Sequence, residues 1–268
     1  LAYLLAGMGP FDSLNHVFAA ISTGGFSTRM ENIGYWNSPG IEAVSIVLMI
    51  FGNLNFLTAY ILLKGRFRAF SRNGEIRVQA LLIPLGALVI FVTVTPELYP
   101  QLGKAIRVSL FETVTALTTT GFSTVPYTKW NDAGVFMLII LMLIGGGACS
   151  TAGGIKQFRA YMLYRSLLWE FKRMLLPRNT ITEPFVWQGD IKEFVSDARI
   201  RQTGVFVFLY FLIYAAGVFV LSASGNGIKD SLFEFASSLS TVGLTIGVTL
   251  PGSPAAVLWA ETIGMFLG

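Results

Sequence analysis

Threonine and glycine side by side in an apolar chain suit the coordination of a bare cation. The stretch from Leu117 to Thr124 reads Leu-Thr-Thr-Thr-Gly-Phe-Ser-Thr. Glycine accepts the positive φ angles that carbonyl alignment often needs, and aligned backbone carbonyls replace the water shell of a cation. The stretch carries no acidic side chain, which favours a monovalent ion over calcium, because calcium sites favour carboxylate oxygens.

This stretch occurs in three versions. Aligning Gly25, Gly121 and Gly243 also aligns a Ser-Leu pair that lies twelve and eleven residues before each glycine. An internal repeat of this kind predicts a repeated architecture. Small-residue packing segments are common in membrane helices, but three aligned copies favour three walls of a narrow cation filter. A fourth wall would close the filter, and we expect it in sequence that precedes this chain.

A short semi-apolar segment precedes each copy. These segments are too short to cross a bilayer, which takes about 20 apolar residues. The C-terminal end of such a half-helix carries partial negative charge and would point toward a cation. Asp12-Ser13 and Asp230-Ser231 are typical N-caps. The three predicted half-helices are Asp12 to Ser22, Ala105 to Thr118 and Asp230 to Ser240.

The composition predicts an all-α polytopic membrane protein. Of the 268 residues, 53% are hydrophobic and 13% are charged, and the mean hydropathy is +0.64. The pI of 9.2 does not indicate nucleic acid as a partner, because the basic residues flank apolar segments. The single cysteine, Cys149, excludes an internal disulfide. The predicted spans are Ile41 to Leu63, Gln79 to Thr95, Ala133 to Ala148 and Thr203 to Leu221.

The two ends of the chain look like parts of helices. Leu1 to Gly9 resembles the end of a span, and Ala255 to Gly268 resembles the beginning of another. Because the chain opens on leucine and stops within an apolar run, we expect it to be a fragment.

Charge bias orients the repeats. The connection from Lys64 to Arg77 has five basic residues and one acid, and Lys156 to Arg201 has nine basic residues and five acids. Lysine and arginine favour the cytoplasmic side, so the three Gly/Thr loops are expected to face outside. Two spans separate successive loops, which predicts parallel repeats rather than the inverted repeats of many secondary transporters.

The segment Gly145 to Lys156, here called the glycine-rich loop, contains five glycines and interrupts the helix after the middle copy. Broken backbone at membrane depth is tolerated only where protein or a water-filled cavity satisfies it. A helix from about Gln157 to Leu175 is expected to follow, near the inner interface, and then a linker from Pro177 to Asp190.

Together these motifs resemble the Trk/Ktr/HKT superfamily of potassium transporters, closest to the Trk-type membrane subunit. The resemblance covers the second to fourth of the family's four pore-loop repeats. Ser240 to Gly247 is more similar to the Ktr branch, so the subfamily stays open. The motifs that carry the resemblance are Ser22 to Thr28 with Ile33 to Pro39, Thr118 to Ser123, and Gly145 to Lys156.

The resemblance implies potassium uptake across the cytoplasmic (inner) membrane. It implies four helix, pore-loop, helix units around a central ion, a homodimer embedded in membrane lipid, and a cytoplasmic nucleotide-binding regulatory subunit. It implies no enzymatic activity and no cofactor, since K⁺ is the transported ion. A basic residue that the family places in its last helix would lie beyond Gly268.

Site residues follow from the same resemblance. The expected filter positions are Thr23, Gly24, Gly25 and Phe26; Thr119, Thr120, Gly121 and Phe122; and Thr241, Val242, Gly243 and Leu244. The glycine-rich loop resembles the family's intramembrane gating loop, although a packing kink is the other interpretation. Its candidate residues are Gly145, Gly146, Gly147, Ser150, Thr151, Gly153, Gly154 and Lys156.

The expected organisation has five parts. Pore-loop repeats occupy residues 1–63, 79–175 and 203–268, and the middle one includes the broken helix. Cytoplasmic connections occupy residues 64–78 and 176–202.

Several polar residues have two interpretations. His16, Glu112 and Glu234 each lie nine residues before an aligned glycine; they either support the filter or are satisfied by local backbone. Lys156 either reaches a carbonyl near the gate or extends to the inner interface, and the second is favoured. Asn53 and Asn55 either bond across helices, which is favoured, or line the inner vestibule.

Other functions stay open. A sodium or mixed transporter of the same superfamily is the main alternative, and an alternating-access secondary transporter is the next. An intramembrane hydrolase would need a serine with a base, for which only Ser150 with Lys156 is available.

Overall fold

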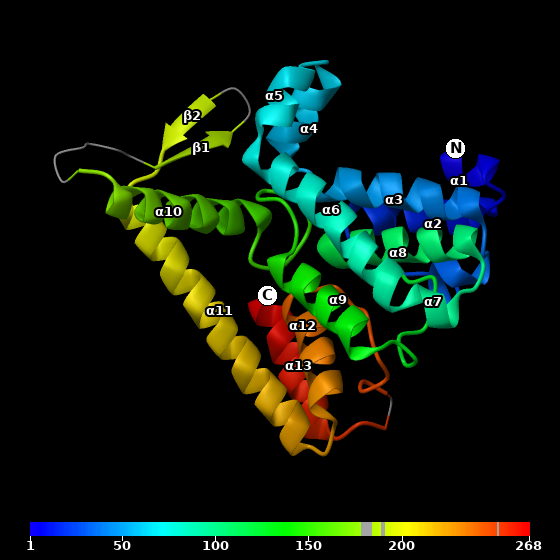
Figure 1. The fold of residues 1–268 in the computed structure, drawn as a ribbon. Helices are drawn as coiled ribbons and strands as arrows, with labels where there is room; N and C mark the ends of the chain where they lie inside the picture. The colour runs from blue at the N-terminus through cyan, green and yellow to red at the C-terminus, as the bar shows by residue number, and fades with distance from the viewer. Residues whose placement is uncertain (178–183, 189–190, 251) are drawn as a thin grey trace.

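The structure is a computed structural model that describes the whole chain except residues 178–183, 189–190 and 251. It is almost entirely helical, with one small hairpin beside α10 (Figure 1). The helices form three units, each built around one short helix that ends in a Gly/Thr loop. The three short helices are α2 (Pro10–Ile21), α8 (Leu102–Leu117) and α12 (Ile228–Leu239).

The predicted N-caps of the first and last short helices are wrong. Gly9 and Gly227 are the N-caps, and neither helix has a side-chain cap bond. In α2 the reason is Pro10, whose fixed φ suits the first helical position and starts the helix early. Asp12 and Asp230 lie instead within the first turn, where the helix dipole favours a negative charge.

Among the described residues, two helices are long and apolar enough to cross a membrane by themselves, α6 (Gly74–Thr93) and α11 (Asp197–Ala223). Both expose large apolar side chains along their length, such as Leu81 on α6 and Phe219 on α11. Shorter apolar helices are α9 (Asp132–Ile144) and α13 (Ala255–Leu267).

The predicted single span from Ile41 to Leu63 is broken into α3 (Pro39–Asn53) and α4 (Phe56–Leu63), which meet at 116°. The break has a local cause. Leu54 is extended, with φ −68° and ψ 138°, and the Asn55 side chain accepts a hydrogen bond from Leu57 N and caps α4. The pair counts as a third span only if a bent span is allowed.

Both segments predicted as loops contain regular structure. Residues 64–78 include α5 (Phe67–Arg72) and the start of α6. Residues 176–202 include the antiparallel strands β1 (Phe185–Gln188) and β2 (Ile191–Phe194). The hairpin lies against α10 (Gln157–Leu175), which has the predicted bounds, and Arg165 Nε donates to Phe185 O at 3.4 Å. The remaining short helices are α1 (Ala2–Leu5), η1 (Asn32–Tyr35) and α7 (Thr95–Leu98).

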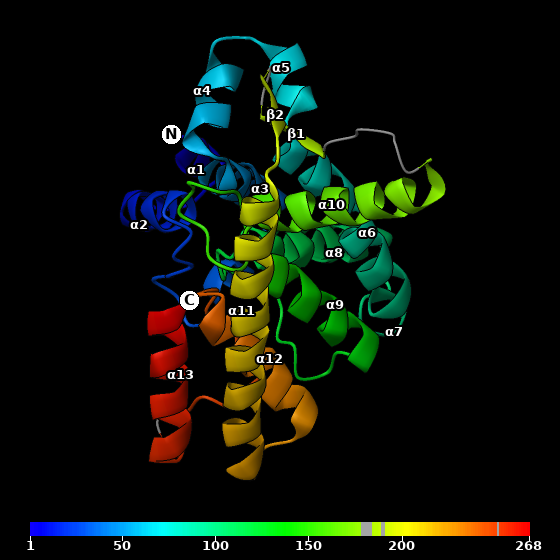
Figure 2. The same ribbon diagram turned by 90° about the vertical axis from the view of Figure 1, so that its left-hand side faces the viewer.

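The middle unit forms the centre of the molecule. One apolar cluster joins α2 and α3 to α8 through Phe111 and Val114, and a second joins α8 and α9 to α11 and α12 through Leu117 and Leu138. Figure 2 shows α11, α12 and α13 side by side at one end. Because α8 lies in both clusters, the loop that follows it is enclosed from both directions.

Candidate functional site

The three short helices end in the same backbone motif. The loops that follow are called the first loop (Thr23–Phe26), the middle loop (Thr119–Phe122) and the last loop (Thr241–Leu244). The opening threonines have φ of 52°, 51° and 53°. The next backbone N–H in each loop donates to the carbonyl five residues earlier, at 2.8 to 3.1 Å, which is the Schellman cap. Glycine usually occupies this left-handed position, and a β-branched residue there is strained. The backbone therefore repeats with the sequence.

The aligned glycines pack each loop against the next one. All three have positive φ, from 65° to 88°. A Cβ on Gly25 would lie 2.2 Å from Thr120 O, and a Cβ on Gly121 would lie 1.9 Å from Val242 O. A Cβ on Gly243 would meet nothing within 4 Å. The loops therefore form an ordered arc whose last face is open.

The exposure of the loop residues also depends on the position of each loop in the arc. Phe122 in the middle loop is fully buried, whereas Phe26, at the same place in the first loop, is 81% exposed. Thr119 and Thr120 are buried, whereas Thr241 and Gly243 of the last loop are exposed. The predicted filter positions are thus brought together, with the middle loop enclosed between the other two.

Glu112 braces the middle loop from behind. Its carboxylate is fully buried in α8. Oε1 accepts hydrogen bonds from Thr124 N at 2.9 Å and Thr124 Oγ1 at 2.6 Å, and Oε2 accepts from the Tyr127 hydroxyl. A buried carboxylate is expensive unless it is hydrogen-bonded, and these donors lie just after the loop.

Glu234 does the same for the last loop. Its carboxylate accepts from Thr245 Oγ1 at 2.7 Å, Ile246 N at 3.1 Å and both Thr249 N and Oγ1, at 3.2 and 2.6 Å. The interpretation of Glu112 and Glu234 as supports of the loops agrees with these contacts.

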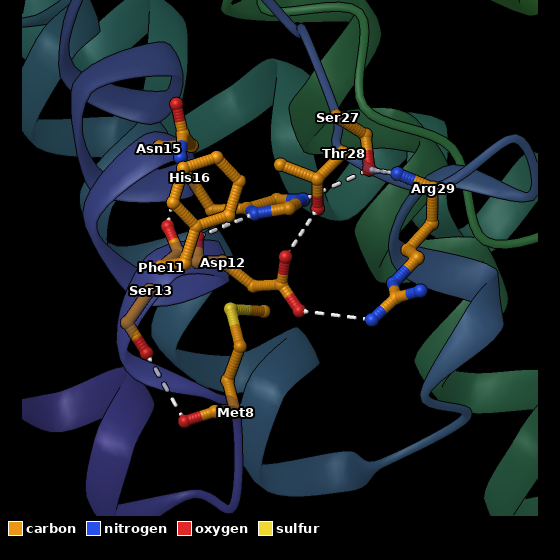
Figure 3. Close-up of polar contacts among 9 residues, drawn as sticks. All are labelled: Met8, Phe11, Asp12, Ser13, Asn15, His16, Ser27, Thr28 and Arg29. Atoms are coloured by element: carbon orange, nitrogen blue, oxygen red, sulfur yellow. Dashed lines mark hydrogen bonds and ion pairs between the residues drawn. The ribbon is translucent and has the colours of Figure 1, made fainter.

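His16 on α2 is the counterpart in the first repeat, and Figure 3 shows its polar contacts together with those of Asp12. It is buried, and its Nε2 lies 2.9 Å from Ser27 Oγ. Asp12 on the same helix accepts from Thr28 Oγ1 at 2.6 Å and pairs with Arg29 at 3.3 Å. Buried His16 and partly exposed Asp12 therefore share the role that one buried carboxylate has in the other repeats.

The glycine-rich loop contacts all three opening threonines. Thr23 Oγ1 donates to Thr151 Oγ1 at 3.2 Å, and Gly153 N donates to Thr119 Oγ1 at 2.7 Å. A Cβ on Gly153 would lie 2.3 Å from Thr241 Oγ1. This loop therefore closes one end of the arc.

Residues outside the loop hold it in place. Gly147 N donates to Asn53 Oδ1 at 3.0 Å, Ala148 N donates to Glu75 Oε1 at 2.6 Å, and Gln157 Nε2 donates to Gly145 O at 3.0 Å. The Lys156 ammonium donates to Ala152 O. Lys156 therefore reaches a carbonyl of the loop, whereas we had expected it to extend to the inner interface. The bend between α3 and α4 brings Asn53 to the loop.

Comparison with known proteins identifies the family. A family model for TrkH cation transport proteins matches residues 5–257. The chain belongs to the TrkH family. The Trk system potassium uptake protein TrkG of Escherichia coli is 31% identical over 252 residues, which cover 93% of this chain and 50% of TrkG. An uncharacterized cation transporter of Methanocaldococcus jannaschii is 30% identical over 268 residues, covering 100% of this chain and 53% of that protein.

The fold agrees with a solved TrkH structure. The crystal structure of the potassium transporter TrkH from Vibrio parahaemolyticus matches with a TM-score of 0.83 and 26% identity, over 100% of this chain and 57% of that chain. The predicted family and the all-α membrane fold are confirmed. This TrkH-family chain spans about half the length of the curated relatives it matches.

Some site residues of this TrkH-family chain were not predicted. Glu75 and Gln157 hold the glycine-rich loop, and Thr249 joins Glu234 to Glu261 of α13. Acids within or beside apolar segments were the available signal, because such groups are expensive there. Ser150 Oγ donates to Gly147 O while Lys156 donates to Ala152 O, so the serine and lysine of the hydrolase alternative are not hydrogen-bonded to each other.

Proposed function

We propose that this chain forms three walls of a potassium uptake pathway, with the first, middle and last loops as its backbone-carbonyl filter. One observation carries the proposal: each aligned glycine faces the carbonyl before the next aligned glycine, from Gly25 to Thr120 O and from Gly121 to Val242 O. The same contact between successive units is what a rotation about a common axis would produce. Such an arrangement surrounds an ion with equivalent oxygens.

A fourth wall would complete the filter. The open side of the arc lies between the last and first loops, where Gly243 has free space and Phe26 is exposed. A further loop of the same kind fits the same contact there. The cargo would then be held by oxygens from four units.

The glycine-rich loop is proposed as the gate. It reaches the opening threonine of every loop, so its displacement would open the inner end of the filter. Its anchors on Asn53 and Glu75 connect it to the bend between α3 and α4 and to the start of α6. Movement of those segments would therefore be coupled to gating.

The wider assembly is proposed from the family. The loops face outside in the inner membrane, two copies form a dimer in lipid, and a cytoplasmic nucleotide-binding subunit acts on the gate. Relatives named as Trk system potassium uptake proteins support potassium as the cargo. Sodium transport, or mixed sodium and potassium transport, is the alternative, and a selectivity measurement distinguishes it from potassium uptake.

The test is ion uptake by the full-length protein in cells that lack their own potassium uptake. Gly121→Ser is expected to abolish potassium selectivity, because a side chain there meets Val242 O. Gly103→Ser is the control, since nothing lies within 4 Å of a Cβ at Gly103. Normal potassium over sodium selectivity in Gly121→Ser would contradict the filter assignment. Full regulated uptake in cells without any cytoplasmic subunit would contradict the proposed regulatory partner.

A further inference from the structure

The glycine-rich loop forms hydrogen bonds with the opening threonines of two loops but not with that of the third. Thr23 Oγ1 donates to Thr151 Oγ1 at 3.2 Å, and Gly153 N donates to Thr119 Oγ1 at 2.7 Å. Among the described residues, no hydrogen bond joins the glycine-rich loop to Thr241. The start of the last loop is therefore held by something else.

Tyr210 of α11 provides that support. Its hydroxyl lies 2.8 Å from Ser240 Oγ, at the residue immediately before Thr241, and the two hydroxyls form a hydrogen bond. Both side chains are buried. In the described part of the chain, the Ser240 hydroxyl has no other hydrogen-bond partner. This contact ties the start of the last loop to a helix that is long enough to cross a membrane.

Ser240 lies between Tyr210 and the glycine-rich loop. A Cβ on Gly153 would lie 2.2 Å from Ser240 O and 2.3 Å from Thr241 Oγ1, so the two loops already touch there. A packed contact mainly resists closer approach. A hydrogen bond also resists separation, because it weakens steeply outside a narrow range of length and angle. The bond from Tyr210 therefore supplies the restraint that the Gly153 contact lacks.

The Tyr210 ring is itself firmly placed. It belongs to the apolar cluster that also contains Leu239 and Val242, on either side of the bonded serine. The ring of Phe206, one turn earlier on α11, lies 6.2 Å away between ring centroids. Close packing of this kind leaves a side chain little freedom. Movement of Ser240 away from the ring would leave two buried hydroxyls unpaired, which is costly.

The middle repeat shows why the last one needs an outside partner. Thr118 is the equivalent of Ser240, three residues before the aligned glycine, and its hydroxyl lies 2.8 Å from that of Thr120. The middle loop thus supplies the partner itself. In the last loop the equivalent of Thr120 is Val242, which has no hydroxyl. Tyr210 supplies the group that Val242 cannot.

We infer that Tyr210 is a positioning residue of the last loop, whose hydroxyl holds Ser240 so that the carbonyls of this loop stay aligned with those of its neighbours. The inference rests on the proposed filter, because alignment matters where carbonyls replace the water shell of the ion. A last loop released from α11 is therefore expected to reduce ion selectivity. Tyr210 lies outside the repeated motif, so no filter pattern in the sequence points to it.

The test is the ratio of potassium to sodium uptake by the full-length protein in cells that lack their own potassium uptake. Tyr210→Phe removes only the hydroxyl and is expected to lower this ratio about fivefold, which corresponds to the loss of one hydrogen bond. Tyr214→Phe is the matched control, because its hydroxyl donates to Leu232 O of α12 at 2.8 Å and not to a loop. This control is expected to lower the Tm by a similar amount and to leave the ratio unchanged.

A double variant separates positioning from stability. Tyr210→Phe alone leaves the buried Ser240 hydroxyl without a partner, and Ser240→Ala in the same chain removes that hydroxyl. Replacing both partners of a buried hydrogen bond by apolar groups is nearly neutral. The double variant is therefore expected to regain most of the Tm lost in Tyr210→Phe while the uptake ratio stays low. Recovery of both quantities would make the contact purely structural and overturn the inference.

The remaining outcomes separate the positioning residue from the filter itself. A wild-type uptake ratio in Tyr210→Phe would overturn the inference. If that variant does not fold, Ser240→Ala alone removes the same hydrogen bond and decides in the same way. Loss of selectivity in Gly121→Ser with normal selectivity in Tyr210→Phe would reject the role of Tyr210 alone. Normal selectivity in both variants would reject the filter as well.

Discussion

Phe26 and Phe122 occupy the same place in successive repeats, yet Phe122 is fully buried and Phe26 is 81% exposed. The backbone before them is the same, with threonine φ angles of 52° and 51°. The local cap therefore fixes the conformation of each loop, while the neighbouring units fix its environment. The middle loop has neighbours on both sides, and the first and last loops each have one.

The braces differ in the same way. Glu112 binds three donors and Glu234 binds four, whereas His16 has one contact with the segment that follows its loop. Hydrogen bonds to charged groups are worth more than neutral ones, about 1.5–3 kcal/mol each. In the first repeat Asp12 supplies two further contacts, with Thr28 and Arg29, so the brace there is divided between two residues.

The largest effect is expected from Gly121→Ala. Its Cβ would lie 1.9 Å from Val242 O at a φ of 84°, so the middle and last loops must separate. A misplacement of about 1 Å at a reacting centre costs roughly a hundredfold in rate, and we expect a loss of rubidium uptake of that order. Gly243→Ala in the full-length protein sharpens the comparison. An equal loss of uptake in Gly243→Ala would agree with a fourth loop packed against Gly243. Unimpaired uptake would show that no further loop packs against that side of the last loop.

Glu112→Ala is expected to destabilise the protein by about 3–5 kcal/mol, because it leaves three donors near the middle loop without an acceptor. Glu112→Gln keeps one acceptor oxygen and is expected to cost about 1–2 kcal/mol. Thermal unfolding in detergent measures both. Glu97→Ala, an exposed carboxylate change, is the control. A Glu112→Ala variant as stable as the wild type would show that the brace is dispensable.

Thr151→Val tests the hold of the glycine-rich loop on the first loop. Valine keeps the shape and removes the hydroxyl that accepts from Thr23 Oγ1 of the first loop at 3.2 Å and donates to Ile21 O at the end of α2 at 3.1 Å. The loss of about 1 kcal/mol corresponds to roughly a fivefold shift toward the displaced loop. We expect basal rubidium uptake to rise by this factor. Thr262→Val on the exposed side of α13 is the matched control, and unchanged uptake in Thr151→Val would separate the loop from gating.

The smallest effect is expected from Asp12→Asn near the start of α2. The hydrogen bond from Thr28 and the charge of Arg29 lower the pKa of Asp12. A lowered pKa means that the ionised form stabilises the folded state above the unfolded pKa of about 3.9, and that this is lost as the pH falls through the folded value. The small Tm difference between wild type and Asp12→Asn at pH 7 should therefore disappear near pH 3. A difference that persists there would assign the effect to packing.

Features with a local cause were predictable from the sequence. The Thr-x-Gly pattern specified the loops, since a left-handed cap needs only a few residues, and α10 has the predicted bounds. The filter and gate assignments stay predictions. The bend after Asn53 was missed because the apolar run continues from Phe56 to Leu63, although Asn53 and Asn55 at the bend were the available signal.

Features that depend on distant packing were not predictable. Thr120 O lies against Gly25 because two units pack together, and no pattern within either unit specifies that distance. Glu75 reaches Ala148 across 73 positions of the chain. The N-cap of α2 was misplaced for another reason, since proline at the first helical position outweighed the Asp-Ser signal.

Cys149 is the only cysteine in this chain, and it lies exposed on the glycine-rich loop in a left-handed conformation, with φ 52°. Its carbonyl accepts from Phe56 N, so it sits where the loop meets the bend between α3 and α4. A fluorophore attached to this thiol would label this chain at one defined place in the loop. Its emission and its rate of labelling would report in real time whether the loop is displaced as the gating proposal requires.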